Sequence, residues 1–255
     1  MARGRVFAAN WKMHLGPAEA RDYLATFLAG FEPDPAARYW FFPSAVSLEA
    51  VAVALNGHPN IAVGAQDVYW EPKGAFTGAT SVGLAKAAGA SIALIGHSER
   101  RHVFGETVPE TARKLRAVLG NGLTPLLCVG ETVADREAGT TLEVVLGQLH
   151  GALDGLVASD LAKVVVAYEP VWAIGTGKNA PPAAAAAVHS AIRTDLRGHG
   201  HPAPEVLYGG SVNLGNVGAL LAESELDGVL VGGASLDPAG WRRLVSGTSP
   251  PGSKS

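Results

Sequence analysis

The sequence has one cysteine and no long apolar run. Cys128 is the only thiol among the 255 residues, so no disulfide forms within the chain. The N-terminus lacks the apolar stretch of a signal peptide, and a reducing, cytoplasmic setting is the simplest expectation. No apolar run approaches the roughly 18–20 residues of a membrane-spanning helix, so we expect no association with a membrane.

The sequence also has little excess charge of either sign. Its 20 Lys and Arg residues nearly balance 23 Asp and Glu residues, for a formal net charge of −3. Nucleic-acid-binding proteins carry a basic excess, and single-strand binders interleave it with aromatic residues; neither feature is present. We therefore expect no nucleic-acid partner, while a local basic site for a small anion stays open.

The remaining composition is that of a folded globular chain. Apolar residues make up 47% and charged residues 17% of the sequence. No shift in composition marks a linker, so we expect residues 1–255 to form a single domain. Residues 247–255 are small and polar, which predicts a flexible C-terminal tail.

Short runs of apolar, β-branched or aromatic residues recur along the chain. Most are continuously apolar instead of alternating, as in parallel strands that are buried on both faces. The eight predicted strands are Val6–Ala9, Tyr39–Phe42, Ile61–Ala65, Ile92–Ile95, Leu126–Val129, Val164–Tyr168, Val206–Tyr208 and Val229–Val231.

Helical patterns lie between these runs. The predicted helices include Pro17–Gly30, Thr107–Leu119, Thr140–Val157, Pro181–Leu196, Leu214–Leu221 with Asn213 as N-cap, and a last helix opened by Asp237-Pro238. Eight alternating strand–helix units in about 250 residues predict an α/β fold, a single (β/α)8 TIM barrel. An open, doubly wound sheet is the structural alternative, although it usually has fewer units.

Polar residues follow the predicted strands at their C-terminal ends, where barrels of this kind carry their chemistry. Glu169 offers a general base, His97 a group that polarises a carbonyl, and Lys12 a fixed cation. The glycine-rich turns 209–211 and 232–233 offer backbone N–H groups to a phosphate. Singly, each has an ordinary structural explanation. Together they favour proton abstraction next to a carbonyl in a small phosphorylated substrate.

Other kinds of site are not indicated. Residues 175–180 imitate a dinucleotide-binding glycine motif, but they begin seven residues after Tyr168 and not in a tight turn after the strand. His97 and His102 are five positions apart, the wrong spacing for one helix face, and no cysteine cluster is present. We therefore expect neither a cofactor nor a metal site.

Seven blocks of sequence, in order along nearly the whole chain, closely resemble the triosephosphate isomerase family. The blocks are AANWKM (8–13), GAFTG (74–78), IGHSERR (95–101), CVGE (128–131), AYEPVWAIGTGK (167–178), LYGGSV (207–212) and VGGASL (231–236). The resemblance implies interconversion of dihydroxyacetone phosphate and D-glyceraldehyde 3-phosphate through an enediol(ate), in glycolysis and gluconeogenesis, without cofactor or metal.

The resemblance also implies roles for individual residues. Glu169 matches the base, His97 the electrophile, and Asn10 and Lys12 the pair that contacts the substrate. The matches to backbone phosphate contacts are Gly175, Ser211, Gly232 and Gly233, and the matches to buried polar support beside His97 are Ser98 and Glu99. His97 begins a predicted helical turn, whose N-terminus disfavours a charged imidazolium.

The segment after Glu169 resembles the family's mobile lid. Residues 170–172 match its first hinge, 173–175 its rigid tip and 176–178 its second hinge. Such a lid would shield the reactive intermediate from water.

The long segment 66–80 resembles a protruding loop that docks on a second subunit, with Thr77 near the partner's active site, and this implies a homodimer. Many family members have an acidic residue where this chain has Ala79, so Arg100 loses one expected partner, while Glu106 could still pair with it.

Two alternative functions remain. The chain could be an inactive barrel retained as a phosphate-binding or interaction protein, or an isomerase of another small sugar phosphate. The first would need a lost catalytic position, whereas Asn10, Lys12, His97 and Glu169 are all present.

Overall fold

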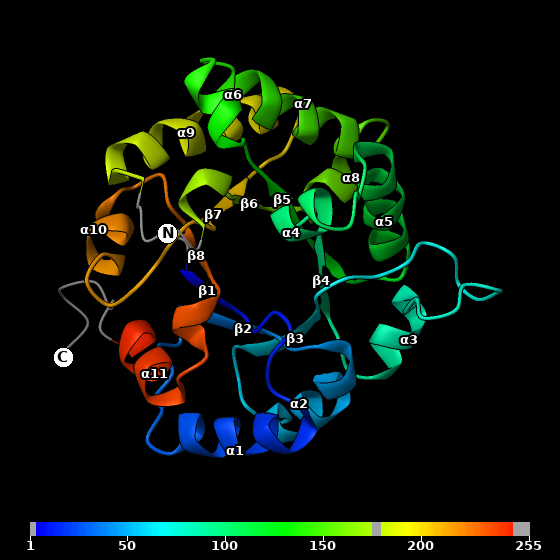
Figure 1. Cartoon of the computed structure of the whole chain (residues 1–255), viewed down its shortest axis with the longest axis vertical. Helices are drawn as coiled ribbons and strands as arrows, with labels where there is room; N and C mark the ends of the chain where they lie inside the picture. Colours follow the sequence, from blue (N-terminus) through cyan, green and yellow to red (C-terminus); the bar gives the residue numbers. More distant parts are fainter. Residues whose placement is uncertain (1–3, 175–179, 247–255) are drawn as a thin grey trace.

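Eight parallel strands form a closed barrel in the computed structural model, which describes residues 4–174 and 180–246. The strands follow chain order around the barrel, and β8 returns to pair with β1, with Gly228 opposite Val6 (Figure 1). Their bounds are β1 Val6–Asn10, β2 Arg38–Phe42, β3 Ile61–Ala65, β4 Ile92–Ile95, β5 Thr124–Val129, β6 Val165–Tyr168, β7 Glu205–Tyr208 and β8 Gly228–Val231. The predicted (β/α)8 barrel is confirmed, and the open sheet is excluded.

The strands are continuously apolar because both of their faces are buried. Val6 and Ala8 belong to the apolar cluster inside the barrel, together with Trp40 and Leu94. Phe7, the residue between Val6 and Ala8, belongs instead to the cluster that packs against the helices. Successive side chains of a strand point to opposite faces, so each strand serves two separate cores.

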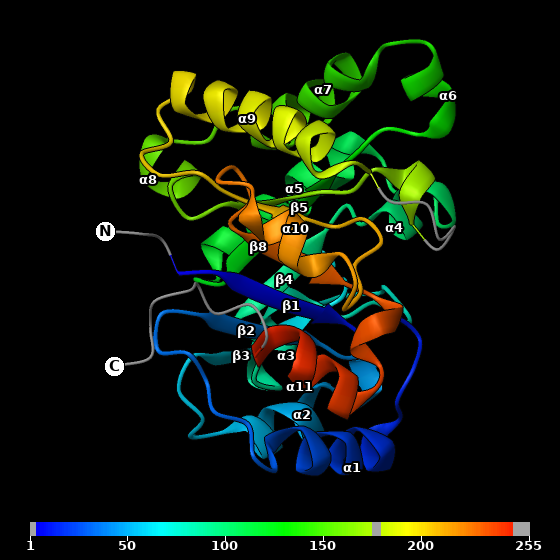
Figure 2. The ribbon, with the colours of Figure 1, turned by 90° about the vertical axis from the view of Figure 1, so that its left-hand side faces the viewer.

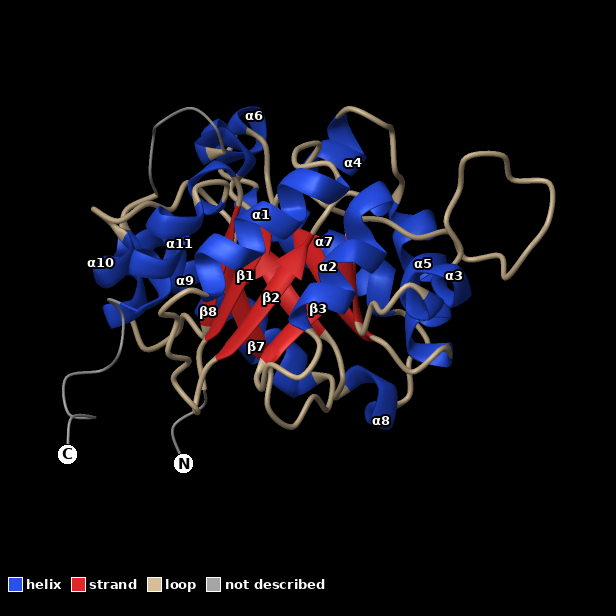
Figure 3. Ribbon diagram, turned by 90° about the horizontal axis from the view of Figure 1, so that it is seen from below, coloured by secondary structure: helices blue, strands red, loops and turns tan. Residues whose placement is uncertain are grey.

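Helices surround the barrel as an outer layer (Figures 2 and 3). The α-helices are α1 Pro17–Leu28, α2 Leu48–Leu55, α3 Val82–Ala87, α4 Ser98–His102, α5 Val108–Gly120, α6 Val133–Glu137, α7 Thr141–Leu153, α8 Ala158–Leu161, α9 Pro182–Gly198, α10 Val217–Ala222 and α11 Pro238–Ser246. Short 3-10 turns are η1 Ala45–Ser47, η2 Val171–Ala173 and η3 Gly233–Ser235. None of the helices within these described ranges is long and apolar enough to cross a membrane.

Two helix predictions need correction. The predicted helix over 140–157 ends at Leu153, and a separate short helix, α8, follows. Asn213 does not cap a helix: its Oδ1 accepts a hydrogen bond from the N–H of Gly215 at 2.8 Å, and α10 begins only at Val217. This side chain closes a local turn, because an asparagine oxygen can bond a nearby N–H in either setting. The predicted flexible tail, 247–255, lies outside the described residues.

Candidate active site

A cavity of about 310 Å³ opens at the C-terminal ends of the strands. The residues around it come from strands β1, β4, β6, β7 and β8 or from the turns that follow them. They include Asn10, Lys12, His97, Glu169, Ser211, Gly232 and Gly233. The structure thus brings together the predicted site residues that it describes, because parallel strands end at the same rim. Gly175, the remaining predicted phosphate contact, lies outside the described residues.

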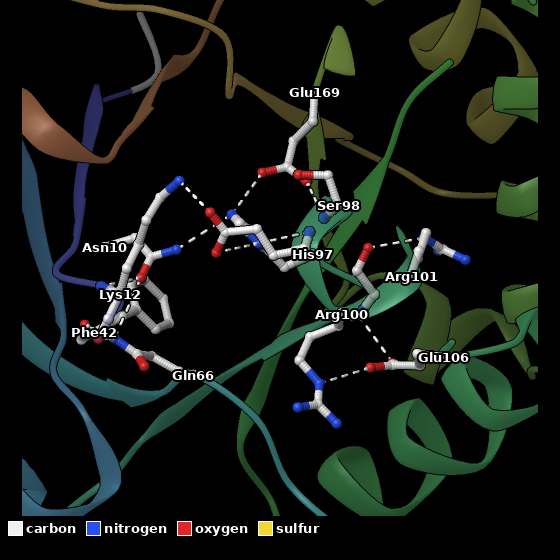
Figure 4. Close-up of polar contacts among 12 residues, drawn as sticks. Asn10, Lys12, Phe42, Gln66, His97, Ser98, Arg100, Arg101, Glu106 and Glu169 are labelled. Carbon is white, nitrogen blue, oxygen red and sulfur yellow. Dashed lines mark hydrogen bonds and ion pairs between the residues drawn. The ribbon is translucent and has the colours of Figure 1, made fainter. Parts of the chain in front are cut away.

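Glu169 is held at the N-terminus of helix α4 (Figure 4). Its side chain is only 2% exposed. Oε2 accepts a hydrogen bond from the backbone N–H of Ser98 at 2.8 Å, and Oε1 lies 3.1 Å from Nε2 of His97. The carboxylate is thus held between a backbone N–H and the imidazole of His97.

His97 is the N-cap residue of α4, as the predicted helical turn requires. The backbone N–H of Glu99 donates to its Nδ1 at 3.3 Å. An Nδ1 that accepts leaves the ring proton of a neutral imidazole on Nε2, the atom that faces the cavity. The ring can therefore donate a hydrogen bond to an oxygen in the cavity.

Asn10 adds a second donor beside this imidazole. Its Oδ1 accepts from the backbone N–H of Lys12 at 3.0 Å and from Nε2 of Gln66 at 3.3 Å, which turns its Nδ2 toward the cavity. Nδ2 lies 3.3 Å from Nε2 of His97, so two N–H donors converge on one region.

Gln66 holds this part of the site in place, a role that the sequence analysis did not assign to it. Besides Asn10, its Nε2 contacts the carbonyl oxygens of Lys12 and Phe42, each at 2.8 Å (Figure 4). The only sequence signal is its position directly after strand β3. This amide couples the end of β1 to the ends of β2 and β3.

Lys12 and Glu99 form an ion pair at the mouth of the cavity. Lys12 Nζ lies 2.5 Å from Oε1 of Glu99, and Lys12 has the positive φ of 50° that is uncommon outside glycine. The Glu99 side chain is 44% exposed, so its prediction as buried support is wrong. Ser98, by contrast, is buried as predicted. Glu99 stays half-buried and reaches toward Lys12 at the mouth of the cavity, because α4 buries only its first residue.

Glycines keep the cavity open beside the charged groups. A Cβ on Gly209 would lie 2.7 Å from Cγ of Glu169, closer than such atoms approach, so a larger residue there would displace the carboxylate. A Cβ on Gly232 would lie 3.0 Å from Cε of Lys12. The turn after β7 therefore needs glycine at 209 for close approach, whereas at Gly232 the flexible Lys12 side chain could move aside.

The segment that follows Glu169 is anchored by Glu131. This carboxylate is fully buried, and its Oε1 accepts hydrogen bonds from the Tyr168 hydroxyl at 3.1 Å and from Nε1 of Trp172 at 2.8 Å. Burial, reinforced by the charge of Glu131, raises the pKa of Tyr168. Arg136 stacks on the Trp172 ring, 4.2 Å from its centroid. Residues 170–172 are thus fixed at this rim; the predicted tip residue Gly175 and second hinge, 176–178, are outside the described residues.

Cys128 is fully buried inside the barrel. Burial raises the pKa of its thiol well above the ordinary value, and the nearby charge of Glu169 adds to the effect. A protonated, enclosed thiol is a poor nucleophile.

Of the two histidines rejected as metal ligands, His97 is buried at the cavity and His102 is exposed. A different group of potential ligands, His150, Asp195 and His199, comes together elsewhere on the described surface. Its only sequence signal is the four-residue step from Asp195 to His199.

Comparisons with known proteins agree with this geometry. The family model for triosephosphate isomerase matches residues 5–248. The chain is 44% identical over 248 residues to triosephosphate isomerase of Solibacter usitatus, covering 96% of this chain and 99% of the relative. It is 44% identical over 252 residues to that of Roseiflexus castenholzii, covering 97% and 99%. It is 45% identical over 247 residues to that of Moorella thermoacetica, covering 96% and 98%. The chain belongs to the triosephosphate isomerase family.

Proposed function

We propose that this protein interconverts dihydroxyacetone phosphate and D-glyceraldehyde 3-phosphate through an enediol(ate) intermediate. The observation that carries the proposal is the meeting of a buried carboxylate, two N–H donors and an ammonium group in one cavity. Glu169, His97, Asn10 and Lys12 supply these groups. Proton transfer next to a carbonyl needs a base, donors for the oxygen that becomes negative, and a fixed positive charge.

In the forward direction, the Glu169 carboxylate removes a proton from C1 of the ketose. The electrons of that C–H bond form the C1–C2 double bond, and the carbonyl oxygen becomes the oxyanion of an enediolate. The N–H groups of His97 and Asn10 donate to this oxygen. His97 then moves a proton between the two oxygens, and Glu169 returns its proton to C2, which leaves an aldehyde at C1.

Two contacts must change before this chemistry begins. Glu169 is bound to the N–H of Ser98, and Lys12 is paired with Glu99. The base must leave Ser98 to reach carbon, and the Lys12 ammonium must turn from Glu99 toward the substrate. We infer that the anionic substrate drives the second change, since it competes with Glu99 for the same cation.

The phosphate is assigned to the turns after β7 and β8. Ser211, Gly232 and Gly233 line the cavity, and Gly232 lies next to the Lys12 side chain. Gly175 of the lid would complete this contact, as the family resemblance implies.

We further propose that the protein is a homodimer formed through the loop 66–80. The loop projects from the barrel between β3 and α3 (Figures 1 and 3), and its residues 71–79 are all exposed. At its base Tyr69 donates its N–H to the carbonyl of Thr80 at 2.8 Å, so the projection is held in shape. A hollow of about 490 Å³, lined by Trp70, Ala79, Arg100 and Phe104 among others, lies beside it and could receive the same loop of a second copy.

This chain has Ala79 where many family members have an acidic residue, yet Arg100 still pairs with two carboxylates. Its guanidinium lies 3.4 Å from Oε2 of Glu106, which confirms the predicted pair, and 3.0 Å from Oδ2 of Asp67. Both partners come from the same chain, so Arg100 is held in position at the proposed interface before a second subunit docks.

A coupled assay tests the proposed activity. Purified protein with dihydroxyacetone phosphate and excess EDTA should produce D-glyceraldehyde 3-phosphate, detected by a dehydrogenase that does not need metal. Phosphoglycolate, which imitates the enediolate, should compete with substrate. Absence of turnover would favour the inactive phosphate-binding barrel, and faster turnover of longer sugar phosphates would favour another isomerase.

A further inference from the structure

Three metal-ligand side chains converge where helices α7 and α9 end. His150 lies in the last turn of α7, Asp195 in the last turn of α9, and His199 directly after α9. Helices α7 and α9 pack side by side on the outside of the barrel (Figure 2). Their C-terminal ends lie at the face of the barrel opposite the catalytic cavity, because each helix runs antiparallel to the strands.

The ligand atoms are close to the spacing of a metal site. Nε2 of His150 lies 2.9 Å from Oδ2 of Asp195, and Nδ1 of His199 lies 3.4 Å from the same oxygen. One such atom from each residue lies within 4.8 Å of the others. Atoms bound at about 2.0–2.2 Å to a tetrahedral ion are roughly 3.3–3.6 Å apart, so rotations of the two exposed rings would bring the three ligand atoms to that spacing.

The two imidazoles face one carboxylate and each other. Their ring centroids are 5.0 Å apart, and Nδ1 of His199 also donates to the backbone carbonyl of Asp195 at 2.9 Å. On metal binding each ring would keep one proton but carry it on its other nitrogen, which frees the lone pair that faces the centre.

The surroundings would stabilise the ligands once bound. A cavity of about 220 Å³ lies beside the trio, and its apolar wall includes Leu153, Leu156, Leu161 and Leu196. Asp195 is 17% exposed, whereas the imidazoles are 50% and 59% exposed. The carboxylate is therefore fixed by packing, while the open side leaves a coordination position for water.

We propose that His150, Asp195 and His199 form a surface site for a divalent transition-metal ion of the Zn²⁺ class, which clamps the end of α7 to the end of α9. Two imidazole nitrogens and one carboxylate oxygen are ligands that zinc accepts with a fourth position left to water. The proposed site departs from the expectation that the chain has no metal site, and it is independent of the proposed isomerase reaction. Since the ion would bind only the folded chain in this geometry, it would raise the melting temperature.

Calorimetric titration of metal-free protein with ZnCl₂ tests the proposal. The number of Zn²⁺ ions bound per chain should be higher by one in the wild type than in the double variant His150→Ala/His199→Ala. Each single variant should lower the affinity at least about tenfold, the loss seen even for outer-shell groups. His58→Ala, which removes an exposed histidine elsewhere, should bind zinc like the wild type. Equal binding by wild type and double variant, including none by either, would overturn the proposal.

Two further readouts separate a metal site from a folding effect. The two single variants, His150→Ala and His199→Ala, and the double variant should all retain isomerase activity, since these residues lie at the face of the barrel opposite the catalytic cavity. Zinc should raise the melting temperature of the wild type and of His58→Ala, and EDTA should reverse the rise. In crystals soaked with zinc, anomalous scattering should place the ion among the three side chains; an ion found only beside His97 would contradict the assignment.

Discussion

At the scale of single residues, the active site depends on the absence of a side chain at Gly209. A methyl group there would meet Cγ of Glu169 at 2.7 Å. We expect Gly209→Ala to shift the carboxylate and lower kcat by about a hundredfold, because a displacement of about 1 Å in a reacting group has that effect. Steady-state kinetics measure it. Gly218→Ala, where an added Cβ meets nothing within 4 Å, is the matched control; equal kcat in both variants would contradict the prediction.

His189 couples stability to pH. It is fully buried near the rings of Tyr168 and Tyr208, and burial lowers its pKa to about 3. Its folded pKa is below the unfolded value of about 6.5, so the unfolded chain binds the extra proton. The contribution is therefore complete above about pH 6.5, and it falls by up to about 1.4 kcal/mol for each pH unit below that, down to about pH 3.

Replacing this histidine should remove that dependence. In urea unfolding at pH 7, 6 and 5, we expect the free energy of unfolding of the wild type to fall more steeply with acid than that of His189→Phe. Other titrating groups contribute equally to both proteins, so the difference between the two slopes reports His189. Parallel curves would show that the histidine is not held neutral.

The main site residues were predictable one by one, but their contacts were not. Glu169, His97, Asn10 and Lys12 each follow a strand, and strand ends meet at one rim, so sequence order locates them. Whether Glu99 is buried depends on which way a five-residue helix turns, and apolar patterns say nothing about so short a segment. Gln66 was missed as a positioning residue because its three contacts come from backbone and side-chain atoms of other strands.

At the scale of elements, the segment that follows Glu169 is fixed to the rim by the buried carboxylate of Glu131. Tyr168→Phe removes one donor from Glu131 and leaves the rest of the ring in place. We expect the free energy of unfolding to fall by about 1–3 kcal/mol, the effect of weakening the hydrogen bonding of a buried charged group. Chemical denaturation measures the loss. Tyr69→Phe, at the half-buried base of the loop 66–80, is the control; an equal effect in both variants would argue against the Glu131 anchor.

Strands were predicted more accurately than helix starts. The bounds predicted from the apolar runs lie within two residues of the observed strand bounds. A strand that is buried on both faces is apolar throughout, so its ends coincide with the ends of the apolar run. The prediction of Asn213 as an N-cap was wrong because an asparagine before a helix can either cap the helix or close a turn, and the surrounding sequence is compatible with both.

At the scale of the whole molecule, the barrel itself was predictable because repeated strand–helix units leave few other ways to bury every strand. The assembly of subunits was not predictable in this way, since an interface depends on a second surface.

If the loop 66–80 docks on another subunit, Phe76→Asp should shift the protein toward monomer. Phe76 is 40% exposed and packs 4.7 Å from the Tyr69 ring. Sedimentation equilibrium should show the shift, and an unchanged mass would exclude this loop from the interface.

A control for that experiment is Val157→Asp, which adds the same charge at a residue that is 61% exposed between α7 and α8. It should leave the assembly unchanged. A loss of mass in both variants would point to charge or instability and not to a specific interface.

The central claim is that Glu169 moves the carbon-bound proton. The most direct measurement is kcat for Glu169→Gln in both directions of the reaction, beside Glu143→Gln on the exposed face of α7 as a control. Glutamine keeps the shape of the side chain and removes its basicity, so kcat should fall by at least about a hundredfold while the control is unchanged. Turnover of Glu169→Gln at the rate of the wild type would contradict the account.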